Sequence, residues 1–97
     1  MPAASDHLTP RERWVRDVRR QALGAALAAA RQKAGLTQGE LAAASGVSRP
    51  TISRLELGTS SISSDRIWDL ATACGTDPAA LFAEAQSEAN DALTDSD

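Results

Sequence analysis

Signals that start helices recur along this 97-residue chain and divide it into short segments. In the stretch TPRE, Thr9 is placed to cap a helix, Pro10 fits its first position, and Glu12 completes a capping box. Further starts of this kind stand at Thr37 with Glu40, Ser48, Ser64, and Asp77 with Pro78. A glycine follows each of the first four segments, at Gly35, Gly46, Gly58 and Gly75. This punctuation predicts five helices.

The composition agrees with an all-α fold. Apolar residues make up 42% of the chain, and many of them are alanines; there is no tyrosine and one phenylalanine. Alanine and leucine favour helices, whereas β-branched and aromatic residues, which favour strands, are few. The length suits a single domain with a modest core. We therefore expect one small helical domain over residues 9–85.

The first helix is predicted to be unusually long, over residues 10–34. Trp14, Val18 and Ala22 recur at helical spacing along it, and no proline interrupts it. Gly24 weakens the middle of a helix by about 1 kcal/mol relative to alanine. One long helix is favoured, and two helices with a break at Gly24 remain the alternative. Residues 1–8 are expected to form a flexible leader.

Charge is distributed unevenly along the chain. The net charge is −3, but residues 1–36 carry seven basic and three acidic side chains, and residues 77–97 carry six acids and no base. The total is therefore a poor guide to any binding face. Leu81 and Phe82 are expected to face inward from the fifth helix. Residues 86–97 are polar and acidic, so we expect a disordered tail.

Several classes of function are disfavoured by the residues present. Cys74 is the one cysteine, so it has no disulfide partner in the chain, and it is expected to be a small buried apolar residue. No apolar run is long enough to span a bilayer, so a cytoplasmic protein is expected. We find no set of acid, base or metal ligands. The chain is expected to be neither an enzyme nor a cofactor-binding or metal-binding protein.

Two short predicted helices, over residues 37–45 and 48–57, are joined through the sequence ASGVS. Such a pair has the form of a helix-turn-helix, in which the second helix enters the DNA major groove. Gly46 supplies the positive φ that the turn requires. Ala42 is small enough for two helices to cross closely, and Val47 and Ile52 are apolar residues that fill the space between them.

The segment LTQGELAAASGVSRPTISRLELG resembles the phage repressor/Cro, or XRE, family of helix-turn-helix DNA-binding proteins. The resemblance extends without gaps from about Leu23 to Phe82. It implies a five-helix, lambda-repressor-like domain, here with an extended N-terminal helix. It also implies a sequence-specific regulator of transcription, such as a repressor, that binds double-stranded DNA as a homodimer.

The resemblance assigns roles to individual positions. Gln38 corresponds to a glutamine that bonds a DNA phosphate and steadies the recognition helix. The base-facing positions are occupied by Ser48, Arg49, Pro50, Ser53 and Arg54. Two further candidates for DNA contact are Thr37 and Thr59. Arg31 and Glu56 correspond to an ion pair that ties the first helix to the third.

Pro50 lies inside the predicted recognition helix. The first four N–H groups of a helix lack partners inside it, so a proline there costs no hydrogen bond. A proline also pushes the residue before it away from helical angles, so the helix starts either after a Ser48 cap or one residue later with Arg49 at the cap. Arg49 and Arg54 suit guanine O6 and N7, and Pro50 suits a thymine methyl group.

Binding to DNA needs a local basic face and not a basic protein. Apart from Arg49 and Arg54, that face could draw on Arg16, Arg19, Arg20 and Lys33. The family often carries lysine or arginine just after the recognition helix, but the connector TSSISS has neither. Phosphate contacts there would come from hydroxyl and backbone N–H groups.

Two tryptophans leave alternatives open. Trp14 either packs on the domain's own fourth or fifth helix or joins Val18 and Trp68 in a two-fold dimer contact, because large aromatic residues anchor interfaces. Two other functions also remain: an antitoxin that represses its own promoter and binds a toxin through the acidic tail, and a domain that binds another protein instead of DNA.

Overall fold

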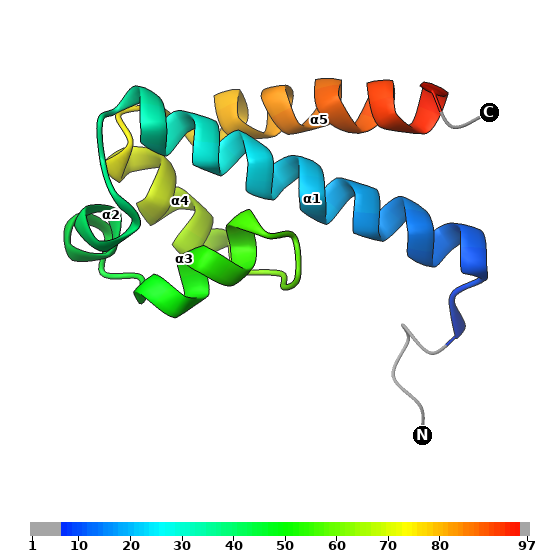
Figure 1. Ribbon diagram of the computed structural model, residues 1–97, viewed down its shortest axis with the longest axis horizontal. Coiled ribbons are helices and arrows are strands. Elements are labelled where there is room, and N and C mark those ends of the chain that lie inside the picture. Colours follow the sequence, from blue (N-terminus) through cyan, green and yellow to red (C-terminus); the bar gives the residue numbers. More distant parts are fainter. Residues whose placement is uncertain (1–6, 96–97) are drawn as a thin grey trace.

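The computed structural model describes residues 7–95, and over this range the chain forms five α-helices in the order shown in Figure 1. Their bounds are α1 Pro10–Lys33, α2 Gln38–Ser45, α3 Arg49–Glu56, α4 Ser64–Ala73 and α5 Pro78–Asp95. The short helices α2, α3 and α4 gather on one side, and α5 runs alongside α1 (Figure 1). The all-α, five-helix fold predicted from the sequence is confirmed. Of the leader, residues 1–6 lie outside the described range.

The predicted helix starts are present for α1 and α2. The Thr9 and Thr37 hydroxyl oxygens each accept a hydrogen bond from the backbone N–H three residues on. In return, the Glu12 and Glu40 carboxylates accept from the backbone N–H groups of Thr9 and Thr37, which completes two capping boxes. For α4 the prediction was one residue late. Ser63, and not Ser64, caps that helix by accepting from the N–H of Arg66. Both serines have the required hydroxyl, so the sequence alone could not choose between them.

The first helix is continuous, and the alternative of a break at Gly24 is wrong. Gly24 is buried, and a Cβ built there would overlap the carbonyl oxygens of Leu55 and Glu56 in α3. The backbone of α1 therefore lies directly on the end of α3. Gly58 allows a second close approach, to Gln21, and also has a φ of 75° that favours glycine.

The core is built from leucine, isoleucine and alanine. Its largest fully buried side chains are Leu27, Leu41, Ile52, Leu55 and Leu70, so α1 to α4 all contribute. Cys74 is partly buried against this cluster. Burial raises the pKa of the Cys74 thiol above its ordinary value, which keeps the thiol protonated at neutral pH. Within residues 7–95 no helix has the length and apolar character needed to cross a membrane.

The expected disordered tail is wrong for residues 86–95, which continue α5. Leu81, Ala85 and Ala89 recur every four residues, and each is at most 6% exposed in the core cluster. This narrow stripe packs α5 against α1, so an apolar face made mostly of alanine is enough to order the segment. Phe82 lies one position beyond the stripe and is 50% exposed, contrary to the inward position expected from the sequence.

Candidate nucleic-acid interface

The turn between α2 and α3 has the geometry that the sequence predicted. Gly46 ends α2 with a φ of 76°, and its N–H donates to the Ala42 carbonyl. Ser45 Oγ accepts from the Val47 N–H at 3.1 Å, and the Val47 side chain is buried. The turn is thus held by these two hydrogen bonds and by the burial of the Val47 side chain. Together they set the angle between α2 and α3.

Helix α3, the recognition helix predicted from the sequence, starts at Arg49. Ser48 is the cap: its Oγ accepts from the Thr51 N–H and lies 2.7 Å from Thr51 Oγ1. The alternative start, with Arg49 at the cap, is therefore wrong. Pro50 is the second helical residue, where the N–H that it lacks would have had no helical partner. The bonds between Ser48 and Thr51 hold the first turn in spite of the proline.

The two faces of α3 differ in burial and charge. Ile52 and Leu55 are buried and hold the helix against the core. On the other side Arg49 and Arg54 are exposed, and within residues 7–95 neither guanidinium forms a hydrogen bond or an ion pair. Ser48 and Pro50 are also exposed, whereas Ser53 is half-buried. The exposed face therefore offers two free cations, one hydroxyl and one rigid apolar ring.

A polar cluster ties α3 to α1 and α2. Arg31 Nε lies 2.7 Å from Glu56 Oε2, and Arg31 Nη2 donates to Glu56 Oε1 at 3.0 Å, so the implied ion pair is present with two-pronged geometry. Arg31 Nη1 also donates to the Leu36 carbonyl. Hydrogen bonds to Glu56 raise the pKa of the Arg31 guanidinium above its ordinary value, so the cation is permanent. The cluster fixes the C-terminal end of α3.

Gln38 belongs to the same cluster. Its Nε2 donates to Glu56 Oε1 at 3.0 Å, a contact that links the first residue of α2 to the last residue of α3. This geometry agrees with the expectation that Gln38 holds α3 in place. The amide retains a second N–H for a phosphate, and Thr37 at the cap accepts from the Glu40 N–H while its own hydroxyl hydrogen stays available. The motif resemblance did not indicate that the Gln38 amide would already be bonded.

Thr59 closes the C-terminal end of α3. Its N–H and its Oγ1 both donate to the Arg54 carbonyl, at 3.0 and 3.1 Å. The hydroxyl keeps its acceptor lone pairs but has no hydrogen left for a phosphate. Thr59 therefore fixes the exit from the helix, and both of its donors are already used, so a phosphate could be reached only through a bridging water.

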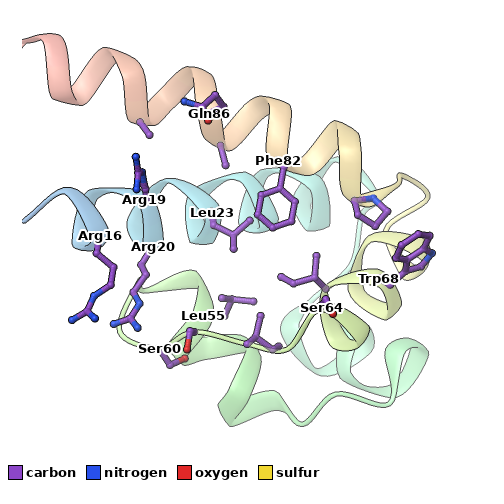
Figure 2. Close-up of a pocket in the computed structure, with 16 residues that line it drawn as sticks. Arg16, Arg19, Arg20, Leu23, Leu55, Ser60, Ser64, Trp68, Phe82 and Gln86 are labelled. Atoms are coloured by element: carbon purple, nitrogen blue, oxygen red, sulfur yellow. The ribbon is translucent and has the colours of Figure 1, made fainter. Parts of the chain in front are cut away.

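The candidate dimer residues do not form one patch. Trp68 on α4 is 65% exposed and lines a groove of about 490 Å³ between α1, α4, α5 and the connector (Figure 2). Val18 is partly buried against the protein's own core. Trp14 is half-buried, with the Arg11 guanidinium 5.2 Å from its ring centroid. Neither Trp14 nor Val18 lines the groove. Sequence reasoning missed this groove because α5 had been expected to end near residue 85.

A turn anchored by the buried Val47, two short helices on either side of it, and an exposed pair of arginines on the second helix have the geometry of a helix-turn-helix domain. Residues 27–81 match the family model described as Helix-turn-helix. The chain belongs to the helix-turn-helix family, of the phage repressor/Cro (XRE) type that its sequence resembles.

Two solved structures are similar over most of their length. The crystal structure of the clp gene regulator ClgR from Corynebacterium glutamicum has a TM-score of 0.72 and 39% identity, covering 80% of this chain and 84% of that one. A second crystal structure of ClgR from the same organism has a TM-score of 0.69 and 40% identity, covering 72% of this chain and 90% of that one. Among curated proteins, none matches this chain.

Proposed function

We propose that this protein is a sequence-specific DNA-binding regulator of transcription that inserts α3 into the major groove. The observation that carries the proposal is the state of Arg49 and Arg54, which are exposed and have no partner among residues 7–95. The opposite face of the same helix is fixed by Ile52 and Leu55. A rigid helix with two unpaired guanidinium groups suits recognition of base edges.

The residues on the exposed face of α3 suit different parts of the DNA. Each arginine suits the O6 and N7 acceptors of a guanine. Pro50 offers an apolar surface for a thymine methyl group, and Ser48 and Ser53 offer hydroxyls to bases or phosphates. The N-terminal end of α2, with the second N–H of Gln38, suits a backbone phosphate. The similarity to ClgR, a gene regulator, supports this assignment.

We further propose that the protein binds DNA as a homodimer. An eight-residue recognition helix contacts few base pairs, so two copies on two half-sites would supply the specificity that one lacks. Exposed apolar side chains support a partner surface: Leu57 is 68%, Trp68 65% and Phe82 50% exposed. Of the candidates Trp14, Val18 and Trp68, Trp68 supports this proposal best, because Val18 is partly buried against the protein's own core and Trp14 is half-buried.

The antitoxin alternative has lost the feature that favoured it. That hypothesis required a flexible acidic tail able to mask a toxin, whereas residues 86–95 belong to α5 and pack through Ala89. A protein-binding role rests only on the lack of basic residues in the connector TSSISS. The DNA-binding proposal therefore has the stronger support.

The test is a selection of bound DNA from a random pool with the full chain. We expect one preferred sequence, repeated as two half-sites whose centres are about 34 Å apart. A matched selection with the Arg49→Ala, Arg54→Ala double variant should lose the preference while the helical circular dichroism is unchanged. Recovery of random sequence by the wild-type protein would contradict the proposal.

A further inference from the structure

Arg16 and Arg20 on α1 lie next to the C-terminal end of α3, and we propose that they bind backbone phosphates of DNA beside the recognition helix. The inference rests on the proposed function and adds a second, sequence-independent contact to it. In effect, the N-terminal extension of α1 supplies the basic side chains that the connector lacks.

The placement follows from how α1 crosses α3. Arg16, Arg20 and Gly24 are spaced four residues apart, so they share one face of α1. Gly24 on that face touches the backbone of Leu55, and Gln21 touches Gly58 at the end of α3. Arg20 lies about one helical turn before Gly24 on α1, and Arg16 about two turns before it. Their side chains therefore extend over the connector that follows α3.

The close-up supports this placement. Figure 2 shows the Arg16 and Arg20 side chains leaving α1 toward Ser60, whereas the neighbouring Arg19 leaves toward α5. Arg16, Arg19 and Arg20 all line the groove that also contains Ser60 and Ser61, with Arg19 on its α5 side, and none of the residues that line this groove is acidic. The Arg16 and Arg20 side chains therefore lie on the side of α1 that faces Ser60, which follows the C-terminal end of α3 (Figure 2).

The charges of this cluster are uncompensated. Among residues 7–95, Arg31 and Glu56 form the one ion pair. Neither Arg16 nor Arg20 is therefore paired with a carboxylate within this range. Arg16 Nε is buried without a hydrogen-bond partner. Two adjacent guanidinium groups with hydroxyls suit a phosphodiester better than a single carboxylate.

The cluster is continuous with the proposed base-reading face. Thr59 binds the Arg54 carbonyl, and Ser60 follows it directly. A duplex that holds α3 in its major groove presents a sugar–phosphate strand at each edge of the groove. No lysine or arginine occurs between Arg54 and Arg66, so α1 is the nearest source of positive charge at this edge.

The experiment measures DNA affinity against salt concentration for single variants of the full chain. The probe is a labelled duplex carrying the selected sequence, with an unrelated duplex beside it, read by fluorescence anisotropy. Arg16→Gln and Arg20→Gln should each lower the slope of log affinity against log salt by about one, and they should weaken both duplexes by the same factor. Arg20→Lys, which keeps the charge, should retain the slope.

Arg19→Gln is the matched control, because it removes the same charge from the adjacent position on α1, where the side chain leaves toward α5. A slope equal to that of Arg19→Gln in both test variants would overturn the inference. Weaker self-association in sedimentation, with an unchanged slope, would also overturn it and would assign these arginines to a second copy of the chain.

The two proposals fail in different ways. A wild-type protein without sequence preference contradicts the proposed function, whereas selective wild-type binding with unaltered slopes in the Arg16 and Arg20 variants contradicts this inference alone. Thermal unfolding of each variant by circular dichroism establishes that the folded fraction is unchanged.

Discussion

Gly24 of α1 lies directly against the carbonyl oxygen of Leu55 in α3, with no side chain between the two helices. The same position would bring a Cβ to 2.7 Å from the Glu56 carbonyl oxygen. Because Leu55 is buried and Glu56 is held by Arg31, the backbone of α3 has little freedom to move away. The position of the recognition helix therefore depends on the absence of a side chain at residue 24.

Replacing Gly24 by alanine should destabilise the protein. Alanine is the better helix former by about 1 kcal/mol, but overpacking against backbone atoms costs typically 1–3 kcal/mol, so a net loss is expected. Gly39→Ala is the matched control, because the nearest atom to its added Cβ is 3.9 Å away. Urea unfolding should show a loss for Gly24→Ala and no loss for Gly39→Ala. Equal stability of the two variants would refute the close contact.

The Arg31–Glu56 pair should behave as a coupled unit. Arg31→Met leaves the Glu56 carboxylate, whose side chain is 8% exposed, with only the Gln38 amide, and removing one partner of a buried pair costs about 3–5 kcal/mol. Arg31→Met with Glu56→Leu should cost clearly less than the sum of the single changes. A double-mutant cycle by urea unfolding measures this coupling, and additivity within about 0.5 kcal/mol would contradict it.

The C-terminal half of α5 should contribute to stability through Ala89. Ala89→Glu places a charge at a site that is 3% exposed against α1, and we expect a loss of roughly 3 kcal/mol or more. Ser87→Glu adds the same charge at an exposed position of the same helix and should change little. Thermal unfolding distinguishes the two. Similar melting temperatures of the two variants would contradict the packing of Ala89 against α1 and would support the disordered tail expected from the sequence.

Acid should weaken the capping box of α2. Hydrogen bonds from the Thr37 backbone, and then from its side chain, hold the pKa of Glu40 below its ordinary value of 4.5. A carboxylate whose pKa is lower in the folded than in the unfolded state stabilises the folded protein at any pH above its unfolded-state pKa. This contribution is lost as the pH falls through its folded-state pKa. The advantage of the wild-type protein over Glu40→Gln, whose amide keeps the bond but does not titrate, should therefore shrink as the pH falls below 4.5.

Glu84→Gln is the control for this titration, since it removes a carboxylate from an exposed position of α5 that is not a cap partner. Its stability difference from the wild type should change less over the same pH range. A Glu40→Gln difference that stays constant with pH would show that the capping bond does not depend on the charge.

The sequence predicted local features well because they depend on neighbouring residues. Capping at Thr9, Thr37 and Ser48 requires one hydroxyl and one backbone N–H a few residues away, so the starts of three helices follow from the residue types. The ion pair of Arg31 with Glu56 came instead from the family resemblance, since nothing local links residues so far apart.

The features that the sequence missed depend on tertiary contact. The Ala85 and Ala89 stripe is weakly apolar, so its burial follows only from the presence of α1 beside it. Gly24 seemed a weak point in a helix, but it is the contact point with α3. The presence of Arg16, Arg20 and Ser60 in one groove likewise requires α1 to lie beside the connector, which no local pattern indicates.

Whether the exposed face of α3 reads bases is tested most directly by the base preference of Arg54→Ala. Affinities of wild type and variant are compared over every single-base change in the selected site. We expect Arg54→Ala to lose about 1–3 kcal/mol of binding and to become indifferent to the base at one position in each half-site. A variant that keeps the wild-type preference at every position, or weakens all sequences equally, would contradict the account.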